Sequence, residues 1–211
     1  EPGQDLQLLN PIELAIVQSR SDATARTDLE ARLVAVLRGA ATDLAKDYAC
    51  RQLALVGSDV CVPALAELLP NPRLSYMARY ALETIPDPSV DDALRDALGK
   101  VQGPPRLGVI GSLGVRRDVK AIDALAELLQ GTDADAAQAA ARALGCIGAP
   151  EAAKALEAAL PTAQGRNQTA VCEGLFRCAE ALTAGGQTAT AQAIYDQLRA
   201  LSDAPRQVQA A

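Results

Sequence analysis

Histidine and tryptophan are both absent from this 211-residue sequence. Without histidine, the chain lacks the commonest general base of enzymes and the commonest protein ligand of transition metals. Aromatic residues make up only 2% of the sequence, whereas hydrophobic residues make up 49%. A core must therefore be built from Ala, Leu, Val and Ile, and small side chains of this kind suit helices that pack closely together.

Positive charge is also scarce, with 20 Lys and Arg residues against 26 Asp and Glu residues and a net charge of −6. Nucleic-acid binding depends on basic patches that release counterions from the phosphates, so no nucleic-acid partner is expected. No apolar run approaches the ~18 residues of a membrane-spanning helix, so no membrane span is expected. These absences favour a protein partner.

The five cysteines form no CxxC motif, so a zinc ribbon or a thioredoxin-like site has no support. Cys61 and Cys178 fall on apolar helical faces, which favours buried thiols that act as small hydrophobic side chains. A Cys50–Cys61 disulfide is the alternative if the protein is exported. Nothing in the sequence supplies an apolar pocket or a charged partner that would shift a carboxylate pKa. We therefore predict no catalytic residue, no metal site and no cofactor, and we do not expect an enzyme.

One six-residue pattern recurs along the chain. ALAELL occurs at 64–69 and again at 124–129, and the pattern Ala, Leu, two variable residues, an apolar residue and Leu also fits 93–98 and 155–160. Residues 193–198 are a fifth copy after a longer gap, with Ile194 and Gln197 in place of the Leu and the apolar residue. A weaker copy lies at 32–37. Positions 1, 2, 5 and 6 of the pattern share one face of a helix, and positions 3 and 4 point away from it. The second-position leucines should be buried against the neighbouring helix of their own unit: Leu65, Leu94, Leu125 and Leu156.

A turn and an earlier apolar helix precede each central copy. The turns are Gly57-Ser58-Asp59, Pro86-Asp87-Pro88, Arg117-Asp118 and Gly148-Ala149-Pro150. The earlier helices are expected at 48–56, 76–85, 107–115 and 136–147. Each unit of about 30 residues is thus a first helix, a tight turn and a second helix. A single hairpin of this kind cannot bury its apolar faces, so the period predicts a stack of hairpins.

The segment RALGCIGAPE at 142–151 resembles the signature of HEAT repeats, in particular the short HEAT-like repeats of phycobilin lyases. Residues 51–57 match the signature more loosely, and Gly108 stands where the signature arginine would be. The resemblance implies an all-α fold, a right-handed α-solenoid (superhelix) of stacked helical hairpins. It also implies a non-enzymatic scaffold for protein–protein interaction. The alternative is an accessory or chaperone-like subunit for an enzyme or a cofactor-carrying protein.

The resemblance divides the chain into four parts. Residues 1–40 are expected to form an N-terminal helical cap, and residues 41–160 the HEAT-like repeats. Residues 161–201 form a longer, atypical hairpin whose segment LTAGG at 182–186 resembles the second half of a tetratricopeptide unit. Residues 202–211 form a polar tail. An atypical terminal repeat is expected because the ends of a stack must be capped.

Acidic residues recur at an outward position of the pattern, which is the strongest indication of a binding surface. The fourth position holds Glu67, Asp96, Glu127 and Asp196, and Glu157 lies beside Ala158, which occupies that position in the remaining copy. In HEAT-type solenoids the second helices usually line the concave, ligand-facing side. We therefore predict that these acids, with Tyr195 as an anchor, bind a basic segment of a protein partner. The alternative is a solvated helix face.

Three glycines lie three residues apart at positions 108, 111 and 114. This spacing differs from the G-x-G-x-x-G of a phosphate-binding loop. We therefore expect these glycines to let the helix approach its neighbours closely.

An exported or periplasmic location is expected, because the chain does not start with Met and is similar to HEAT-repeat chains of environmental bacteria that carry signal peptides. A cytoplasmic location is the alternative.

Overall fold

The structure is a computed structural model that describes residues 10–201. Over that range it contains twelve α-helices, two short 3-10 helices and no strand. The chain divides between Val101 and Gln102 into two compact units, called here the N-terminal and C-terminal units. The predicted all-α class is confirmed.

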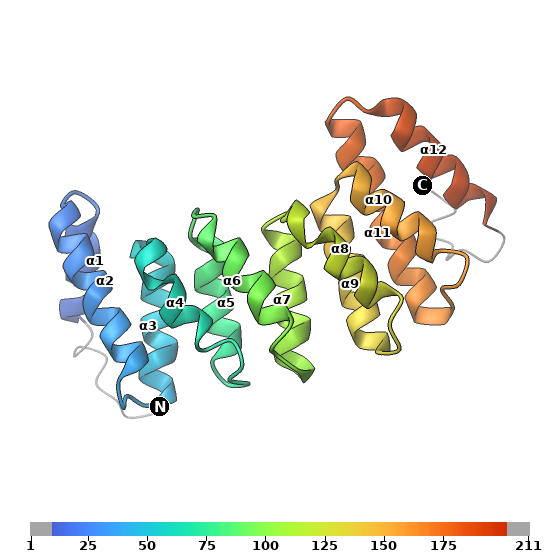
Figure 1. The fold of residues 1–211 in the computed structure, drawn as a ribbon. Helices are drawn as coiled ribbons and strands as arrows, with labels where there is room; N and C mark the ends of the chain where they lie inside the picture. The colour runs from blue at the N-terminus through green and yellow to red at the C-terminus, as the bar shows by residue number, and fades with distance from the viewer. Residues whose placement is uncertain (1–9, 202–211) are drawn as a thin grey trace. The chain divides into compact units, whose positions relative to one another are not determined.

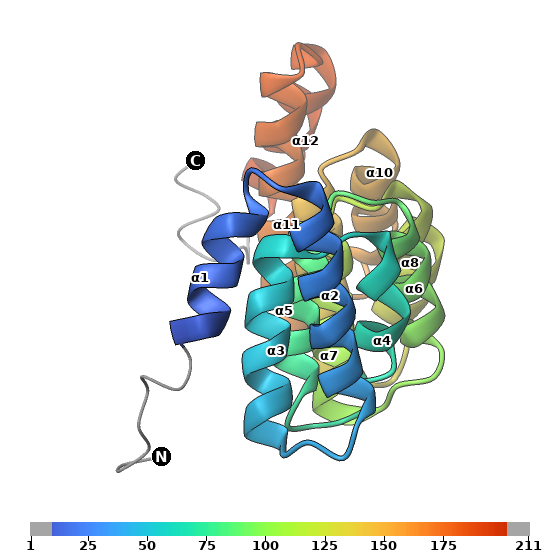
Figure 2. The same cartoon turned by 90° about the vertical axis from the view of Figure 1, so that its left-hand side faces the viewer.

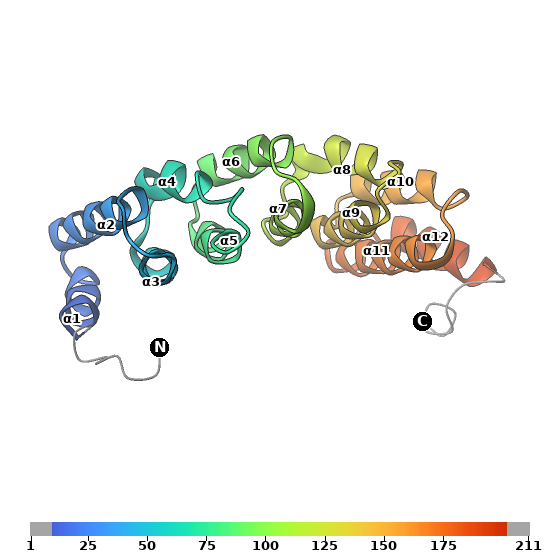
Figure 3. The same cartoon turned by 90° about the horizontal axis from the view of Figure 1, so that it is seen from below.

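The N-terminal unit consists of two rows of helices (Figures 1 and 3). One row holds the first helices of the hairpins and the other holds the second helices. Figure 2 shows α1 beside α3, on the side away from α4. The first row is α1 (Asn10–Ser19), α3 (Asp43–Val56) and α5 (Ser75–Thr84); the second row is α2 (Ala23–Arg38), α4 (Val62–Ala66) and α6 (Ser89–Leu98).

Two contacts show that α3 and α5 run parallel in the register of the repeat. The Arg73 Nη1 atom lies 3.3 Å from the Asp43 carboxylate at the start of the two helices. At their other end, the Thr84 hydroxyl donates a 3.0 Å hydrogen bond to the Ala54 carbonyl oxygen. Both pairs are 30 residues apart. One repeat in the sequence therefore corresponds to a shift of one helix in this row.

The C-terminal unit repeats the arrangement, with first helices of 13, 14 and 20 residues. These first helices are α7 (Gly103–Val115), α9 (Ala134–Ile147) and α11 (Gly165–Ala184), and each packs against the next. The second helices α8 (Ile122–Leu129) and α10 (Pro150–Ala159) also contact each other, and α12 (Thr188–Ala200) packs against α11 (Figure 1).

The segment that resembles the HEAT signature forms the junction between α9 and α10. Gly148 ends α9 in the left-handed conformation, with φ of 67°. Glycine adopts this conformation without the steric cost of a Cβ atom. Pro150 then opens α10 at a position where its missing N–H costs no helical hydrogen bond. The order Gly, Ala, Pro thus produces the predicted tight turn.

Glycines allow the first helices of the C-terminal unit to touch through their backbones. A Cβ atom built on Gly114 of α7 would lie 2.7 Å from the Ala143 Cα atom in α9. A Cβ atom on Gly145 of α9 would lie 2.7 Å from the Gly174 Cα atom in α11. The expected close approach is therefore present at Gly114. A Cβ atom on Gly111 would meet nothing within 4 Å, so at that position the expectation was wrong.

The two ALAELL segments differ in structure although their sequences are identical. The copy at 124–129 lies wholly within α8. At the copy at 64–69, α4 ends at Ala66 and the remaining residues form a turn, so this helix is shorter than predicted. Pro70 follows this copy, whereas Gln130 follows the other. In a continued helix Pro70 would have no N–H group for the Ala66 carbonyl oxygen, and its ring would clash with that carbonyl, which explains the early end of α4.

The four anchor leucines at the second position of the pattern are fully buried, as the repeat predicts. Their surroundings extend beyond their own hairpins. Helix α10 packs against both α9 and α11, and the methyl groups of Leu156 lie beside Gly174 of α11. Burial of the leucines therefore joins successive hairpins as well as the two helices of each one.

Candidate functional site

A groove with an apolar floor and an acidic edge lies between α4 and α6 in the N-terminal unit. Its volume is about 600 Å³, and we call it the α4/α6 groove. Four carboxylates line it, against a single ammonium group. The floor consists of Val62, Pro63, Ala66, Pro70, Ala93, Ala97 and Val101, and the charged lining residues are Asp59, Glu67, Asp87, Asp96 and Lys100.

The repeat places Glu67 and Asp96 in this groove. Both occupy the fourth position of the pattern, Glu67 directly after α4 and Asp96 within α6. Because α4 and α6 pack side by side, the same position in successive repeats reaches the same groove. Both side chains are exposed, so packing does not require an acid at either position.

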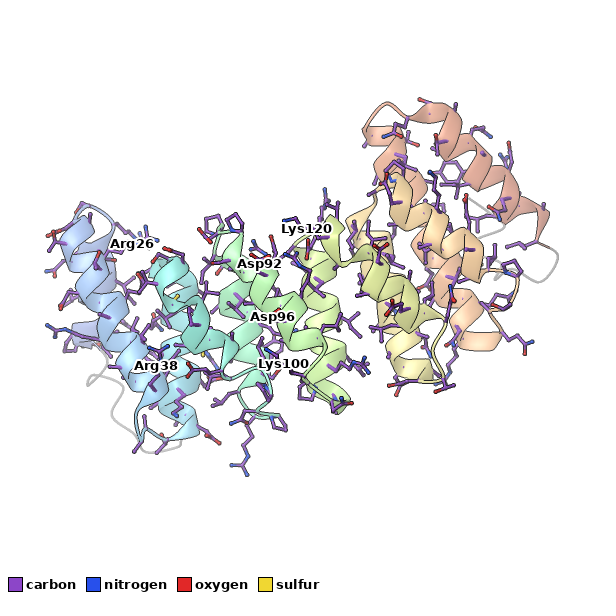
Figure 4. All side chains as sticks on the ribbon, viewed as in Figure 1. Arg26, Arg38, Asp92, Asp96, Lys100 and Lys120 are labelled. Atoms are coloured by element: carbon purple, nitrogen blue, oxygen red, sulfur yellow. The ribbon has the colours of Figure 1, made fainter. Side chains whose placement is uncertain are left out.

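Each of these two acids has a basic neighbour, but the ion pairs are exposed. The Glu67 carboxylate lies 3.3 Å from the Arg38 guanidinium of α2. The Asp96 carboxylate lies 4.0 Å from the ammonium group of Lys100, which is two residues beyond the end of α6 (Figure 4). All four side chains are more than half exposed. Exposed ion pairs contribute only about 0–1 kcal/mol, so a cation from another molecule can compete for these carboxylates.

The turns before α4 and α6 add groups that the repeat pattern did not single out. Asp59 is exposed, and its carboxylate has no hydrogen-bond or ion-pair partner within residues 10–201, although its backbone carbonyl accepts a hydrogen bond from the Val62 N–H group. Asp87 accepts a 2.8 Å hydrogen bond from the Ser89 N–H group at the start of α6. Ser89 also lines the groove, and its hydroxyl is buried with no hydrogen-bond partner in the described part of the chain. Asp59 and Asp87 both lie in the turn that precedes a copy of the pattern. Because an acid recurs at these turns, the two residues could have been predicted from the sequence.

The other predicted binding residues lie in the C-terminal unit. Glu127 is exposed on α8 and Glu157 is half-buried on the adjacent helix α10. Asp196 lies on α12, where its carboxylate accepts hydrogen bonds from Arg199 at 2.7 Å and from Gln192 at 3.1 Å.

Tyr195, the predicted anchor, packs within its own unit. Its ring lies edge-on to the Phe176 ring of α11, with 5.7 Å between the ring centroids. The side chain is half-buried, so part of the ring contributes to the attachment of α12 to α11.

The cysteines are free thiols, and the Cys50–Cys61 disulfide considered above is not formed. Four of the five are buried, as expected for thiols that act as hydrophobic side chains, and Cys146 is partly exposed. Burial raises the pKa of Cys50, Cys61 and Cys178 to about 12, and nearby acidic groups add to the effect. These three thiols therefore stay protonated near neutral pH.

Residues 10–201 contain no group of three or more His, Cys, Asp or Glu side chains that could hold a metal ion. Within the same range, no helix combines the length and apolar character that crossing a membrane requires.

Two comparisons with known proteins found matches. A family model described as HEAT repeats matches residues 104–175, from the start of α7 into α11. One similar solved structure is a crystal structure of an engineered protein from the Northeast Structural Genomics Consortium. It is 19% identical, aligns over 95% of this chain and 92% of its own, and has a TM-score of 0.49. A search of the curated proteins found no match. The family match identifies HEAT-like repeats at residues 104–175, and repeats of this kind form helical scaffolds that usually take part in protein interactions.

Proposed function

We propose that this protein is a non-enzymatic scaffold that binds a basic segment of a protein partner in the α4/α6 groove. The observation that carries the proposal is the combination of an apolar floor with four carboxylates at its edge. A lysine or arginine side chain has the same two parts, an aliphatic stem and a charged end. The stem can cover Ala, Val and Pro side chains of the floor while the charge reaches a carboxylate.

The existing ion pairs leave room for such a partner. A basic segment can take the place of Arg38 at Glu67 and of Lys100 at Asp96, because both pairs are exposed and weak. Asp59 offers a carboxylate without a partner in the described residues. Affinity then depends on several modest contacts made together. The net charge of −6 would speed the approach of a basic partner, and salt would reduce that effect.

The acids of the C-terminal unit extend the proposed surface. Glu127, Glu157 and Asp196, together with the exposed part of Tyr195, would contact a longer partner. The alternative role as an accessory subunit for a cofactor-carrying protein rests on the sequence resemblance alone and stays a prediction. The choice between an exported and a cytoplasmic location also stays a prediction.

The direct test is binding of a synthetic basic peptide to the full chain. A suitable peptide is about three helical turns long, with lysines on one face and leucines on the other. Fluorescence anisotropy would give its Kd for the parent protein and for the double variant E67K/D96K. We expect the double variant to bind about tenfold more weakly, which corresponds to about 1.4 kcal/mol. The affinity of the parent should also fall as salt is added.

The double variant D28K/D43K is the matched control. Both acids lie in the N-terminal unit outside the groove, and each has an arginine partner, Arg32 at 2.9 Å and Arg73 at 3.3 Å. The change in net charge is the same as in E67K/D96K. If both double variants lose affinity equally, the effect is one of overall charge and the groove is not the binding site. If E67K/D96K binds the basic peptide as tightly as the parent, Glu67 and Asp96 are only part of a solvated helix face and do not bind the partner.

A further inference from the structure

A second groove of opposite charge lies among the first helices of the C-terminal unit. Its volume is about 620 Å³, and we call it the α7/α9 groove. Helix α7 contributes apolar residues and an open glycine position, α9 contributes most of the rest, and α11 contributes one arginine. The lining residues are Leu107, Gly111, Val115, Asp135, Gln138, Ala139, Arg142, Ala143, Cys146 and Arg177.

Two arginines in this groove have no carboxylate partner in the part of the chain that the structure describes. Arg142 is exposed and makes no hydrogen bond or ion pair within residues 10–201. Arg177 is exposed, and its Nη1 atom donates a 3.4 Å hydrogen bond to the Cys146 sulfur atom. Some of the other exposed arginines pair with carboxylates, for example Arg51 with Asp47 at 2.7 Å. An anionic group entering the α7/α9 groove would therefore meet guanidinium groups that no carboxylate of the described chain engages.

The charges of the α7/α9 groove differ between its two ends. Asp135, Gln138, Arg142 and Cys146 follow one another on a single stripe of α9 at helical spacing, which spans about three turns or about 16 Å. The acid lies at the N-terminal end of this stripe, and Arg142 lies near its other end. Val115 of α7 is 60% exposed beside it. A helix of similar length, apolar on one side and acidic at one end, would match both the floor and the charges.

We propose that the α7/α9 groove binds an acidic amphipathic helical segment of a protein partner, with its carboxylates at Arg142 and Arg177. This site is independent of the α4/α6 groove, because it lies in the other unit, on first helices, and selects the opposite charge. Leu107, Val115 and the alanines of α9 receive the apolar side of the segment. The open space at Gly111, where a Cβ atom would meet nothing within 4 Å, leaves room for one of its side chains.

Cys146 provides a built-in reporter of occupancy. Its thiol lines the groove and is the partly exposed one among five cysteines, whereas the other four are buried. A maleimide should therefore react with the folded protein at Cys146 first. A segment seated in the groove would cover this thiol and slow the reaction, whatever the partner does in the cell.

The test uses the full chain and a synthetic helical peptide about three turns long. The peptide carries leucines and alanines along one side and two glutamates in its first turn, where acids favour the helix. A second peptide has lysines in place of the glutamates. We expect the acidic peptide near saturation to slow maleimide labelling of Cys146 about tenfold, because only the fraction of protein with an empty groove reacts. The lysine peptide should give little protection.

Charge reversal at the groove gives the second measurement, with Kd from fluorescence anisotropy. The double variant R142E/R177E should bind the acidic peptide about tenfold more weakly, since it replaces two attractions by two repulsions. The control R166E reverses an arginine that is exposed on α11 outside the groove, and its affinity should match that of the parent. Binding to the parent should weaken with added salt, which tests the charge contribution without any substitution.

Three results would overturn the proposal. One is an acidic peptide that leaves the labelling rate of Cys146 unchanged. Another is equal protection by the lysine peptide, which would show that only apolar contact matters. The third is an equal loss of affinity in R166E, which would indicate overall charge. The variant E67K/D96K should bind the acidic peptide like the parent. The proposal for one groove can therefore fail without the proposal for the other.

Discussion

The contact between α7 and α9 can be tested with two alanine substitutions in the same helix. Gly111 and Gly114 both lie in α7, three residues apart. A Cβ atom on Gly111 would enter open space. A Cβ atom on Gly114 would lie 2.7 Å from the Ala143 Cα atom and 3.2 Å from the Ala143 carbonyl oxygen. The two substitutions therefore add the same methyl group in different surroundings.

The expected energies have opposite signs. Alanine is favoured over glycine within a helix by about 1 kcal/mol, so Gly111→Ala should stabilise the protein by about 0.5–1 kcal/mol. Gly114→Ala gains a similar amount from propensity. However, the favourable van der Waals distance between two carbon atoms is about 3.5–4.0 Å, so the backbones of α7 and α9 would have to separate by about 1 Å. Forced overpacking costs about 1–3 kcal/mol. We expect Gly114→Ala to be less stable than Gly111→Ala by that amount.

Urea unfolding followed by circular dichroism at 222 nm would measure both variants against the parent. Repeat proteins can depart from two-state unfolding, so the comparison should use transitions with equal slopes. Equal stability of the two variants would refute the close contact at Gly114. So would a Gly114→Ala variant more stable than the parent. Replacement of Ala143 by glycine in the Gly114→Ala background should restore part of the loss, because it removes one of the crowded methyl groups.

Three further predictions concern the core, one turn and the thiols. Leu125→Ala should lower the free energy of unfolding by about 2–5 kcal/mol in chemical denaturation, because the side chain is fully buried. Arg117→Gly should raise the melting temperature and add about 0.5–1 kcal/mol, because Arg117 has φ of 53° in the turn after α7 and glycine relieves that strain. N-ethylmaleimide near pH 7.5 should modify the native protein at Cys146 and the unfolded protein at all five cysteines, as counted by mass spectrometry. Burial holds the pKa of three thiols in the folded protein at about 12, those of Cys50, Cys61 and Cys178. Above pH 9 the same thiols ionise in the unfolded chain, so the unfolded state binds fewer protons than the folded state. The free energy of unfolding should therefore fall between pH 9 and about 12.

Each of these predictions has a clear contrary result. A loss below about 1 kcal/mol for Leu125→Ala would mean that the repeat register is wrong. A destabilised Arg117→Gly variant would show that the arginine side chain, rather than the backbone, determines the turn. Rapid labelling of several thiols in the native protein, or an unfolding free energy that stays constant above pH 9, would contradict the burial of the cysteines.

The sequence by itself determined the repeat unit. The spacing of the ALAELL-like segments predicted the hairpins, the buried leucines and the turns between helices. These features were predictable because they depend on local chemistry: the apolar period of a helix, and the Gly, Pro and Asp residues that end or start one. The early end of α4 was not predicted, although the sequence contains its cause, since Pro70 follows one copy of the segment and not the other.

Only the tertiary structure decided which of these residues meet. Glu67 and Asp96 share a groove because α4 and α6 pack side by side, whereas Asp196 on α12 has its own neighbours. Arg142 belongs to the HEAT-like signature and Arg177, 35 positions later, does not, yet the packing of α7, α9 and α11 brings them to one groove. A sequence period gives the positions on each helix, but the distance between two helices depends on the side chains of both. The surroundings of a residue therefore follow from the contact between the helices, which neither helix determines alone.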